Sequence, residues 1–143
     1  MKKYIGIGIA IVVVIGLVFL IKYISGKPKT VDFTQVEEAD IPEQITEILP
    51  NYRTKEKALV CKVKDEIYVV VTRGEKSSAG YEVKVKEIFL EEEEGETVVR
   101  VIAQFVDPKP GEVLAQVITY PYTVVKTKLS ELPKKVVLDK EYK

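Results

Sequence analysis

The stretch Lys57–Arg73, with the sequence KALVCKVKDEIYVVVTR, decides the fold. It holds two apolar runs, Lys57–Val63 and Ile67–Arg73, which are separated only by the polar residues 64–66. Valine, isoleucine and tyrosine are enriched in strands, and a short polar interval between two such runs is typical of a β-hairpin. The stretch therefore predicts two antiparallel strands joined by a tight turn.

The chain after this hairpin continues the β pattern. A change of parity near Lys86-Glu87 predicts a bulge in the next strand, and Pro121 interrupts a later one, which places that point at an edge or a bulge. We expect strands over Tyr81–Leu90, Thr97–Val106, Leu114–Lys126 and Val136–Leu138. In the second of these, alternate residues form one apolar face, made of Val99, Val101, Ala103 and Phe105.

The chain before the hairpin predicts one strand and one helix. Val31–Glu37 alternates and is interpreted as the first strand. Asp40 can cap a helix whose first turn accepts Pro42, and Pro50 ends that helix. About six or seven short strands then predict a mainly β fold, a small antiparallel β-sandwich or barrel-like domain with one short helix, and α+β is the alternative class.

A second stretch, Tyr4–Ile21, reads YIGIGIAIVVVIGLVFLI and contains no charged or amide side chain. A helix of this length measures about 27 Å, close to the roughly 30 Å of a bilayer's hydrocarbon core. Ile24 extends the run if Lys22 directs its ammonium group back to the headgroups. We therefore expect a single transmembrane helix as a membrane anchor over residues 1–24 (contacting the membrane through residues 4–24), a juxtamembrane linker over 25–30, and one domain over 31–143.

A cleaved secretory signal is the alternative interpretation of this apolar stretch. A signal peptide has an apolar region of about 7–15 residues and a cleavage site between small residues, whereas this run is longer and lacks a clean site. Lysines lie on both sides of the run, so the numbers of positive charges that flank it, which set the orientation of a membrane helix, are nearly equal. We favour a single-pass cell-membrane protein with a cytoplasmic N-terminus and an extracytoplasmic C-terminal domain, because moving the short charged N-terminus outward brings no evident benefit.

The composition argues against several classes of function. The chain has 22 basic and 22 acidic residues, so it offers no basic surface for nucleic acid. Histidine is absent, which removes the usual general base and the commonest transition-metal ligand. The acidic run Glu91–Glu96 could attract Ca²⁺, but it lacks the alternating ligands of a dedicated loop and is interpreted as a solvated turn. We expect no cofactor and no metal.

We also expect no enzyme. The one catalytic arrangement that the sequence offers is Lys76 beside Ser77 and Ser78, in the manner of a Ser–Lys hydrolase. Neighbours in a polar loop do not by themselves form a dry pocket, and no loop resembles an oxyanion hole. No catalytic residue is therefore assigned. Cys61 is the only cysteine and lies in an apolar strand, where a buried thiol is expected.

Three short motifs follow one another in the C-terminal half. They are Gly80-Tyr81 before a strand, Asp107-Pro108-x-Pro110-Gly111, and Gln116-Val117-Ile118-Thr119-Tyr120-Pro121-Tyr122 followed shortly by Val124-Val125. Glycine permits a sharp turn, and the proline and glycine of the second motif fix another. The two tyrosines of the third motif share one face of their strand, and tyrosine buries a large area at small entropic cost.

With these motifs, the segment Gly74–Lys126 resembles the C-terminal domain of the PrcB family, the protease complex subunit. The resemblance implies a small extracytoplasmic accessory domain that associates with and stabilises a cell-surface or membrane-associated protease, without catalysis of its own. The family's name-giving member is a lipoprotein, whereas this chain has an apolar helix in place of a lipidation cysteine. The partner-binding residues that the resemblance implies are Gly80, Tyr81, Asp107, Pro108, Gly111, Gln116, Tyr120 and Tyr122.

Each of these residues also has a purely structural interpretation. Gly80 and Gly111 are typical turn residues, Tyr81 is typical of an aromatic at the edge of a core, and Gln116 can satisfy a backbone group. Two other functions stay open within the same fold. One is a protease inhibitor that inserts an exposed loop such as Gly74–Tyr81, and the other is a structural envelope protein without a protease partner.

Overall fold

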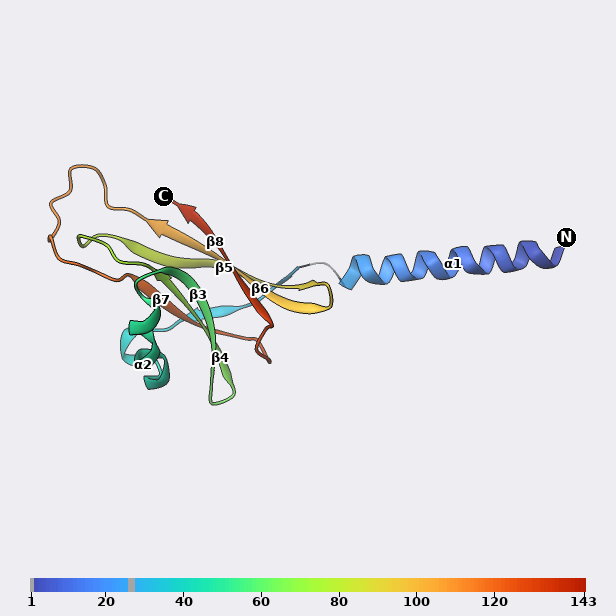
Figure 1. Ribbon diagram of the computed structural model, residues 1–143, viewed down its shortest axis with the longest axis horizontal. Coiled ribbons are helices and arrows are strands. Elements are labelled where there is room, and N and C mark those ends of the chain that lie inside the picture. The colour runs from blue at the N-terminus through green and yellow to red at the C-terminus, as the bar shows by residue number, and fades with distance from the viewer. Residues whose placement is uncertain (1, 26–27) are drawn as a thin grey trace.

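The computed structural model describes the backbone of residues 2–25 and 28–143, and the side chains of residues 8–20 and 28–143 (Figure 1). The predicted linker over residues 25–30 includes residues 26 and 27, which lie outside the described residues. The ends of the predicted anchor, residues 1–7 and 21–24, lie outside the part of the chain whose side chains are described.

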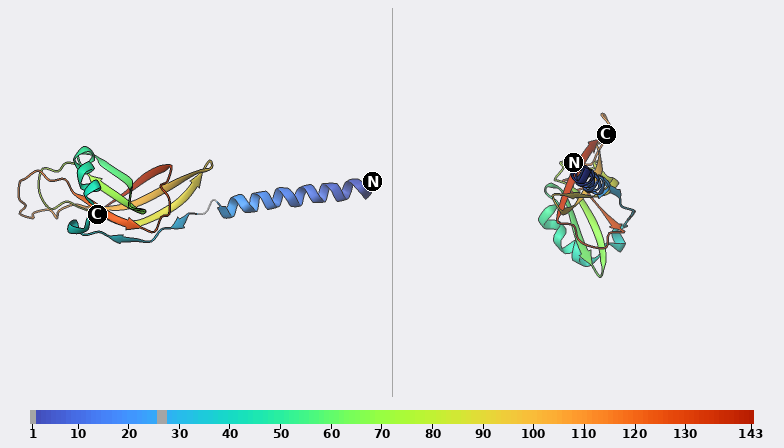
Figure 2. Two further views of the ribbon diagram at one scale, coloured as in Figure 1. Left: turned by 90° about the horizontal axis from the view of Figure 1, so that it is seen from below. Right: turned by 90° about the vertical axis from the view of Figure 1, so that its right-hand side faces the viewer.

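The N-terminal helix α1 spans Lys2–Ser25 and extends away from the β-rich part of the molecule (Figures 1 and 2). Its described side chains, residues 8–20, are apolar or glycine and all of them are exposed. Among the described residues, no helix combines the length and the apolar character that crossing a membrane requires. The transmembrane anchor over Tyr4–Ile21 stays a prediction.

Two four-stranded sheets pack face to face. The first sheet has the order β1-β5-β6-β8 and the second has the order β2-β7-β4-β3. Two helical segments, η1 and α2, follow β2, and α2 covers the second sheet on its outer side (Figure 1). The bounds are β1 Lys29–Thr30, β2 Phe33–Gln35, η1 Glu38–Asp40, α2 Glu43–Tyr52, β3 Glu56–Val63, β4 Glu66–Arg73, β5 Glu82–Glu93, β6 Glu96–Val106, β7 Tyr122–Thr127 and β8 Lys135–Tyr142.

The main core lies between the two sheets, which confirms a mainly β fold and selects the sandwich over the barrel. Strand β6 contributes the predicted apolar face, in which all four side chains are fully buried. Val69 and Val71 of β4 meet this face from the opposite sheet. The expectation of purely antiparallel sheets is wrong, because β8 runs parallel to β6. Strand β7 lies between them in sequence but belongs to the other sheet, so no hairpin joins β6 to β8.

Strand β4 is buried on both faces. Val69 and Val71 point into the sandwich, whereas Val70 belongs to a second cluster with Ile45 and Leu49 of α2. A strand that is covered on both sides shows a continuous apolar run rather than alternation. The apolar run Ile67–Arg73 therefore marks the middle layer, between α2 and the first sheet.

Two tight turns fix the register of the hairpins. Lys64 (φ 47°) and Asp65 (φ 63°) form the turn between β3 and β4, both in the left-handed region that a two-residue type I′ hairpin turn requires. Glu94 (φ 50°) and Gly95 make the corresponding turn between β5 and β6. The acidic turn predicted from Glu91 onward is thus too long, because residues 91–93 belong to β5 and pair with β6. The predicted bulge is confirmed between Val85 and Glu87.

Three element boundaries differ from the prediction. Val31–Glu37 is not one strand, since β1 pairs with β5 and β2 pairs with β7, so the chain passes from one sheet to the other at this point. Asp40 lies in η1 rather than capping α2, and α2 continues through Pro50 to Tyr52. A proline in the last turn removes one hydrogen bond without ending the helix when Ile45 and Leu49 hold it on the sheet.

The strand predicted over Leu114–Lys126 is also wrong in its first half. Regular pairing with β4 begins only at Tyr122, directly after Pro121. Proline has no N–H to donate to a ladder, although its carbonyl oxygen accepts a bond of 2.9 Å from the N–H of Arg73. The preceding residues form a long loop with one isolated bridge, between Thr119 and Lys76.

Candidate functional site

Two loops meet at the end of the sandwich that lies farthest from α1 (Figure 1). They are residues 74–81, between β4 and β5, and residues 107–121, between β6 and β7, and together we call them the distal loop pair. Lys76 and Thr119 exchange two backbone bonds of 2.9 Å, and the Ala79 N–H donates to the Ala115 carbonyl at 3.0 Å. The two loops are therefore held by each other rather than independently.

The side chain of Arg73 joins the distal loop pair to the sandwich. It is 2% exposed, and its guanidinium donates to the backbone oxygens of Val106 (2.6 Å) and Glu82 (3.1 Å) and to the carboxylate of Asp107. Its Cζ lies 4.9 Å from the ring centroid of Tyr81. A buried arginine is tolerable when its donors reach acceptors, and among the described buried side chains the Nε of Arg73 has no hydrogen-bond partner while both of its terminal nitrogens do. Arg73 thus fixes the starting points of both loops.

Gly80 provides the second point of contact between the loops. Its φ of +97° lies in the region that side chains with a Cβ rarely adopt. A Cβ at this position would lie 2.8 Å from Leu114 Cδ2 and 3.1 Å from Pro108 Cβ. The structure therefore brings Gly80, Tyr81, Asp107 and Pro108 of the predicted site together, around Arg73 and Leu114.

Tyr120 and Tyr122 lie on the other side, where the sheet carries α2. The Tyr120 hydroxyl donates to Glu75 at 2.9 Å, and Arg53, directly after α2, lies 4.3 Å from the Tyr120 ring centroid. The hydrogen bond to Glu75 raises the pKa of Tyr120. Tyr122 packs against the cluster of α2, and its burial raises its pKa. The shared face predicted for the two tyrosines agrees with these contacts, but it is not the face of Tyr81.

Gly111 and Gln116 are exposed members of the predicted site. Gly111 has φ +86° with open space around it, so its role in the structure is a turn. Gln116 Nε2 donates to the Leu114 carbonyl at 3.4 Å, which is the local backbone contact that the structural interpretation expects. The predicted residues therefore divide into three groups: four that meet around the buried Arg73, two exposed loop residues, and a pair of tyrosines on the α2 side.

Sequence reasoning missed two parts of this end of the molecule. The first is Arg73, and the sequence feature that could have indicated it is a positively charged residue at the end of an otherwise apolar strand. The second is a set of exposed apolar side chains in the longer loop: Val113, Val117 and Ile118 are 101%, 55% and 63% exposed. Their signal was an apolar run that precedes a proline, which we interpreted as a strand.

The structure gives Lys76 and Ser78 of the shorter loop contacts with other groups. Lys76 Nζ lies 5.3 Å from the ring centroid of Tyr81. The Ser78 hydroxyl is buried and donates to the Ala79 carbonyl at 3.1 Å. Within the residues that the structure describes, no group of three acidic or cysteine side chains is placed to hold a metal ion.

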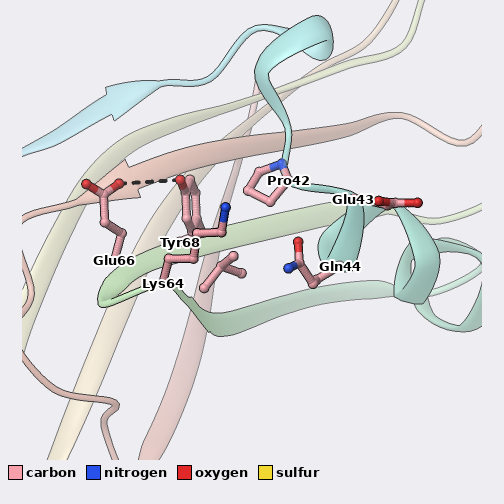
Figure 3. A pocket seen from close by; sticks show the side chains of 7 residues that line it. Pro42, Glu43, Gln44, Lys64, Glu66 and Tyr68 are labelled. Carbon is pink, nitrogen blue, oxygen red and sulfur yellow. Dashed lines mark hydrogen bonds between the residues drawn. The ribbon is translucent and has the colours of Figure 1, made fainter.

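A separate hollow of about 510 Å³ lies between the start of α2 and the β3–β4 hairpin (Figure 3). The Tyr68 hydroxyl donates to Glu66 at 3.4 Å, and burial raises the pKa of Tyr68. Lys126 Nζ lies 2.6 Å from the same carboxylate, and this hydrogen bond lowers the pKa of Glu66. The lining contains none of the predicted site residues: Pro42, Glu43, Gln44, Val63, Lys64, Glu66 and Tyr68.

Fold and site together define a small β-sandwich domain whose candidate site lies in its connecting loops, where binding residues are often found. A family model described as PrcB C-terminal matches residues 67–128, which extend from β4 to just beyond β7 and include the whole distal loop pair. This match confirms the resemblance predicted for Gly74–Lys126. No curated protein and no solved structure matches the chain.

Proposed function

We propose that this chain is an accessory subunit that associates with a cell-surface protease and stabilises it, and that it is not itself an enzyme. The observation that carries the proposal is the PrcB C-terminal match over residues 67–128, since that family suggests a role in a protease complex. The distal loop pair lies entirely within the matched segment, which supports it as the contact surface.

We further infer that α1 anchors the chain in the cell membrane and leaves the sandwich on the extracytoplasmic side. The thirteen residues 8–20 are apolar or glycine, and every one of their side chains is exposed, with Val12 at 69% and Phe19 at 70%. A helix that is apolar all round is suited to lipid rather than to water. Tethering raises the effective concentration of a partner in the same membrane, so a modest affinity suffices.

The proposed partner-binding residues are those of the predicted site. The Tyr81 ring lies beside the Arg73 guanidinium, whereas Tyr120 contacts Glu75 and Arg53, so the two tyrosines test two sides of the distal loop pair. The full chain is recovered from its native membranes with an affinity tag, and the co-purified protease is quantified by casein zymography. Tyr81→Ala and Tyr120→Ala are expected to lower the recovery about tenfold or more, the effect of losing a central aromatic contact.

Leu132→Ala serves as the matched control, because Leu132 is a half-exposed apolar residue in the loop between β7 and β8. Equal recovery with all three folded variants would remove both tyrosines from the site. Stabilisation is measured separately, as the decay of casein hydrolysis in native membranes with and without the chain. Equal decay in the two would contradict the accessory role.

A further inference from the structure

We propose that residues 113–118 enter the substrate cleft of the partner protease and occupy it as an uncleaved, substrate-like loop. This inference rests on the proposed function and names the contact by which the protease is bound. We call residues 113–118 the apex loop. Four properties of the apex loop support the proposal: its exposure, its lack of charge, its fixed ends and its shape.

The apex loop exposes more large apolar side chains than any other loop or strand of the described sandwich. Val113 has no cover at all (101% exposed), and Val117 and Ile118 are more than half exposed. Single exposed apolar residues need no explanation, whereas exposed apolar side chains that gather on a surface mark interaction sites, and three of them lie within these six residues. The same six residues, VLAQVI, contain no charged side chain. They therefore complement an uncharged, apolar cleft and not a charged surface.

Both ends of the apex loop are fixed to the neighbouring loop. At its start, the side chain of Leu114 packs on Gly80, and the Ala115 carbonyl accepts from Ala79. At its end, Thr119 exchanges two backbone bonds with Lys76, and its hydroxyl donates to the Ser78 carbonyl at 2.8 Å. Only residues 116–118 lie between these attachments. A loop that is held in one conformation before binding loses little entropy on binding. In complexes of this pre-organised kind, the backbone of the interface moves little between the free and the bound structures.

The longer loop, which contains the apex loop, projects from the sandwich, and this favours a cleft over a flat partner. Figure 2 shows the longer loop projecting beyond the sheets at the end opposite to α1. A narrow convex loop buries little area on a flat surface, whereas a concave site encloses it on several sides. Protease–inhibitor complexes bury a standard interface area and are among the tightest known.

The loop Gly74–Tyr81, which the sequence suggested as the inserting loop, has a different place in this arrangement. Gly74 and Ser78 are buried, and Lys76 and Ala79 use their backbone groups to hold the longer loop. Loop 74–81 is the support, and the apex loop is the part that is presented. Occupation of the cleft also accounts for stabilisation, because a protease with a filled cleft cannot cut a second copy of itself.

The test uses the full chain in native membranes and two variants, Val117→Asp and Ile118→Asp. Each variant places a carboxylate where the wild type presents an apolar side chain. Both positions are exposed, so both variants are expected to keep the unfolding temperature of the wild type. Leu132→Asp is the control, because it makes the same change at a residue that is 49% exposed in another loop. The amount of recovered protease is read by casein zymography, after the complex has been dissociated.

A second readout is the hydrolysis of fluorescent casein by the intact complex, normalised to the zymogram. For the wild type and Leu132→Asp we expect hydrolysis at least about tenfold below that of the dissociated protease. For Val117→Asp and Ile118→Asp we expect recovery to fall about tenfold, the effect of about 1.4 kcal/mol at a central contact. Normal recovery with both variants and uninhibited hydrolysis by the wild-type complex would overturn the cleft assignment and leave the proposed function standing. Recovery of no protease with the wild type would overturn both.

Discussion

Replacement of Arg73 by methionine tests the central contact of the distal loop pair. Methionine keeps an unbranched apolar stem of similar reach but removes the guanidinium. The wild-type guanidinium donates to two backbone carbonyls, at 2.6 Å and 3.1 Å, and to the carboxylate of Asp107. The variant leaves all three acceptors without their donor. Both loops lose the group that fixes their starting points.

The expected cost follows from the surroundings of the three acceptors. The Asp107 side chain is 52% exposed, so water can replace much of its contact. The two carbonyls lie beside a side chain that is 2% exposed, and an acceptor that is left unsatisfied in such a place costs about 1–3 kcal/mol. We therefore expect Arg73→Met to lower the free energy of unfolding by about 3 kcal/mol. For a domain of this size that corresponds to roughly 10 °C in the unfolding temperature.

The assay is thermal unfolding of the full chain in detergent, followed by the circular dichroism of the β-sheets. Lys84→Met is the control, because it also removes a cation from an ion pair. Unlike Arg73, Lys84 is exposed, as is its partner Glu82 (65% and 60%), and their charged atoms are 3.8 Å apart. Exposed pairs contribute about 0–1 kcal/mol. If Arg73→Met unfolds within 1 °C of the Lys84→Met variant, Arg73 does not hold the loops and the reasoning is refuted.

Three further predictions use other parts of the molecule. Gly80→Ala should lower the unfolding temperature more than Gly111→Ala, because both have positive φ but only Gly80 would bring a Cβ against Leu114 and Pro108; equal shifts would contradict the close contact. Phe105→Ala, at a fully buried position, should cost about 3–5 kcal/mol in urea unfolding, and a cost below about 1 kcal/mol would show that the sheets do not pack as described. The ion pair of Glu66 and Lys126 should stabilise the fold at pH values above the ordinary pKa of Glu66, and this contribution should be lost as the pH falls through the lowered pKa of Glu66 in the folded state. The stability of Lys126→Met at low salt should therefore fall less on acidification than that of the wild type. Identical dependence of stability on pH in the two proteins would count against the pair.

The strands that carry the core were predictable from the sequence because their apolar pattern is local. The β3–β4 hairpin, the bulge near Glu87 and the buried face of β6 all follow from spacing within a few residues. The continuous run in β4 was also informative, since a short apolar run bounded by turn residues is consistent with a strand that is covered on both faces.

The pairing of distant elements was not predictable from local pattern. The parallel arrangement of β6 and β8 depends on where the chain returns after β7, and no short motif encodes that. The apolar run 113–118 has the composition of a strand, but Ala115 and Thr119 form their backbone hydrogen bonds with loop 74–81 and not with a sheet. Regular pairing with β4 begins only after Pro121.

The candidate site was predictable as a region but not as a set of contacts. Gly80, Tyr81, Asp107 and Pro108 come together as the motifs suggested, whereas Tyr122 packs under α2 and Tyr120 lies beside Arg53. Arg73 was missed because a charged residue at the end of a strand ordinarily lies in solvent. Only the tertiary structure brings the carbonyls of β5 and β6 to it.

The most direct test of the central claim, that the chain binds a protease through the distal loop pair, is a hydrogen-exchange footprint of the full chain. Exchange is compared for the chain purified with its co-recovered protease and for the chain alone. We predict slower exchange in residues 74–81 and 107–121 of the complex, and unchanged exchange at the β3–β4 turn and in residues 128–134. Protection at the β3–β4 turn or in 128–134 instead, with the distal loop pair unchanged, would contradict the claim.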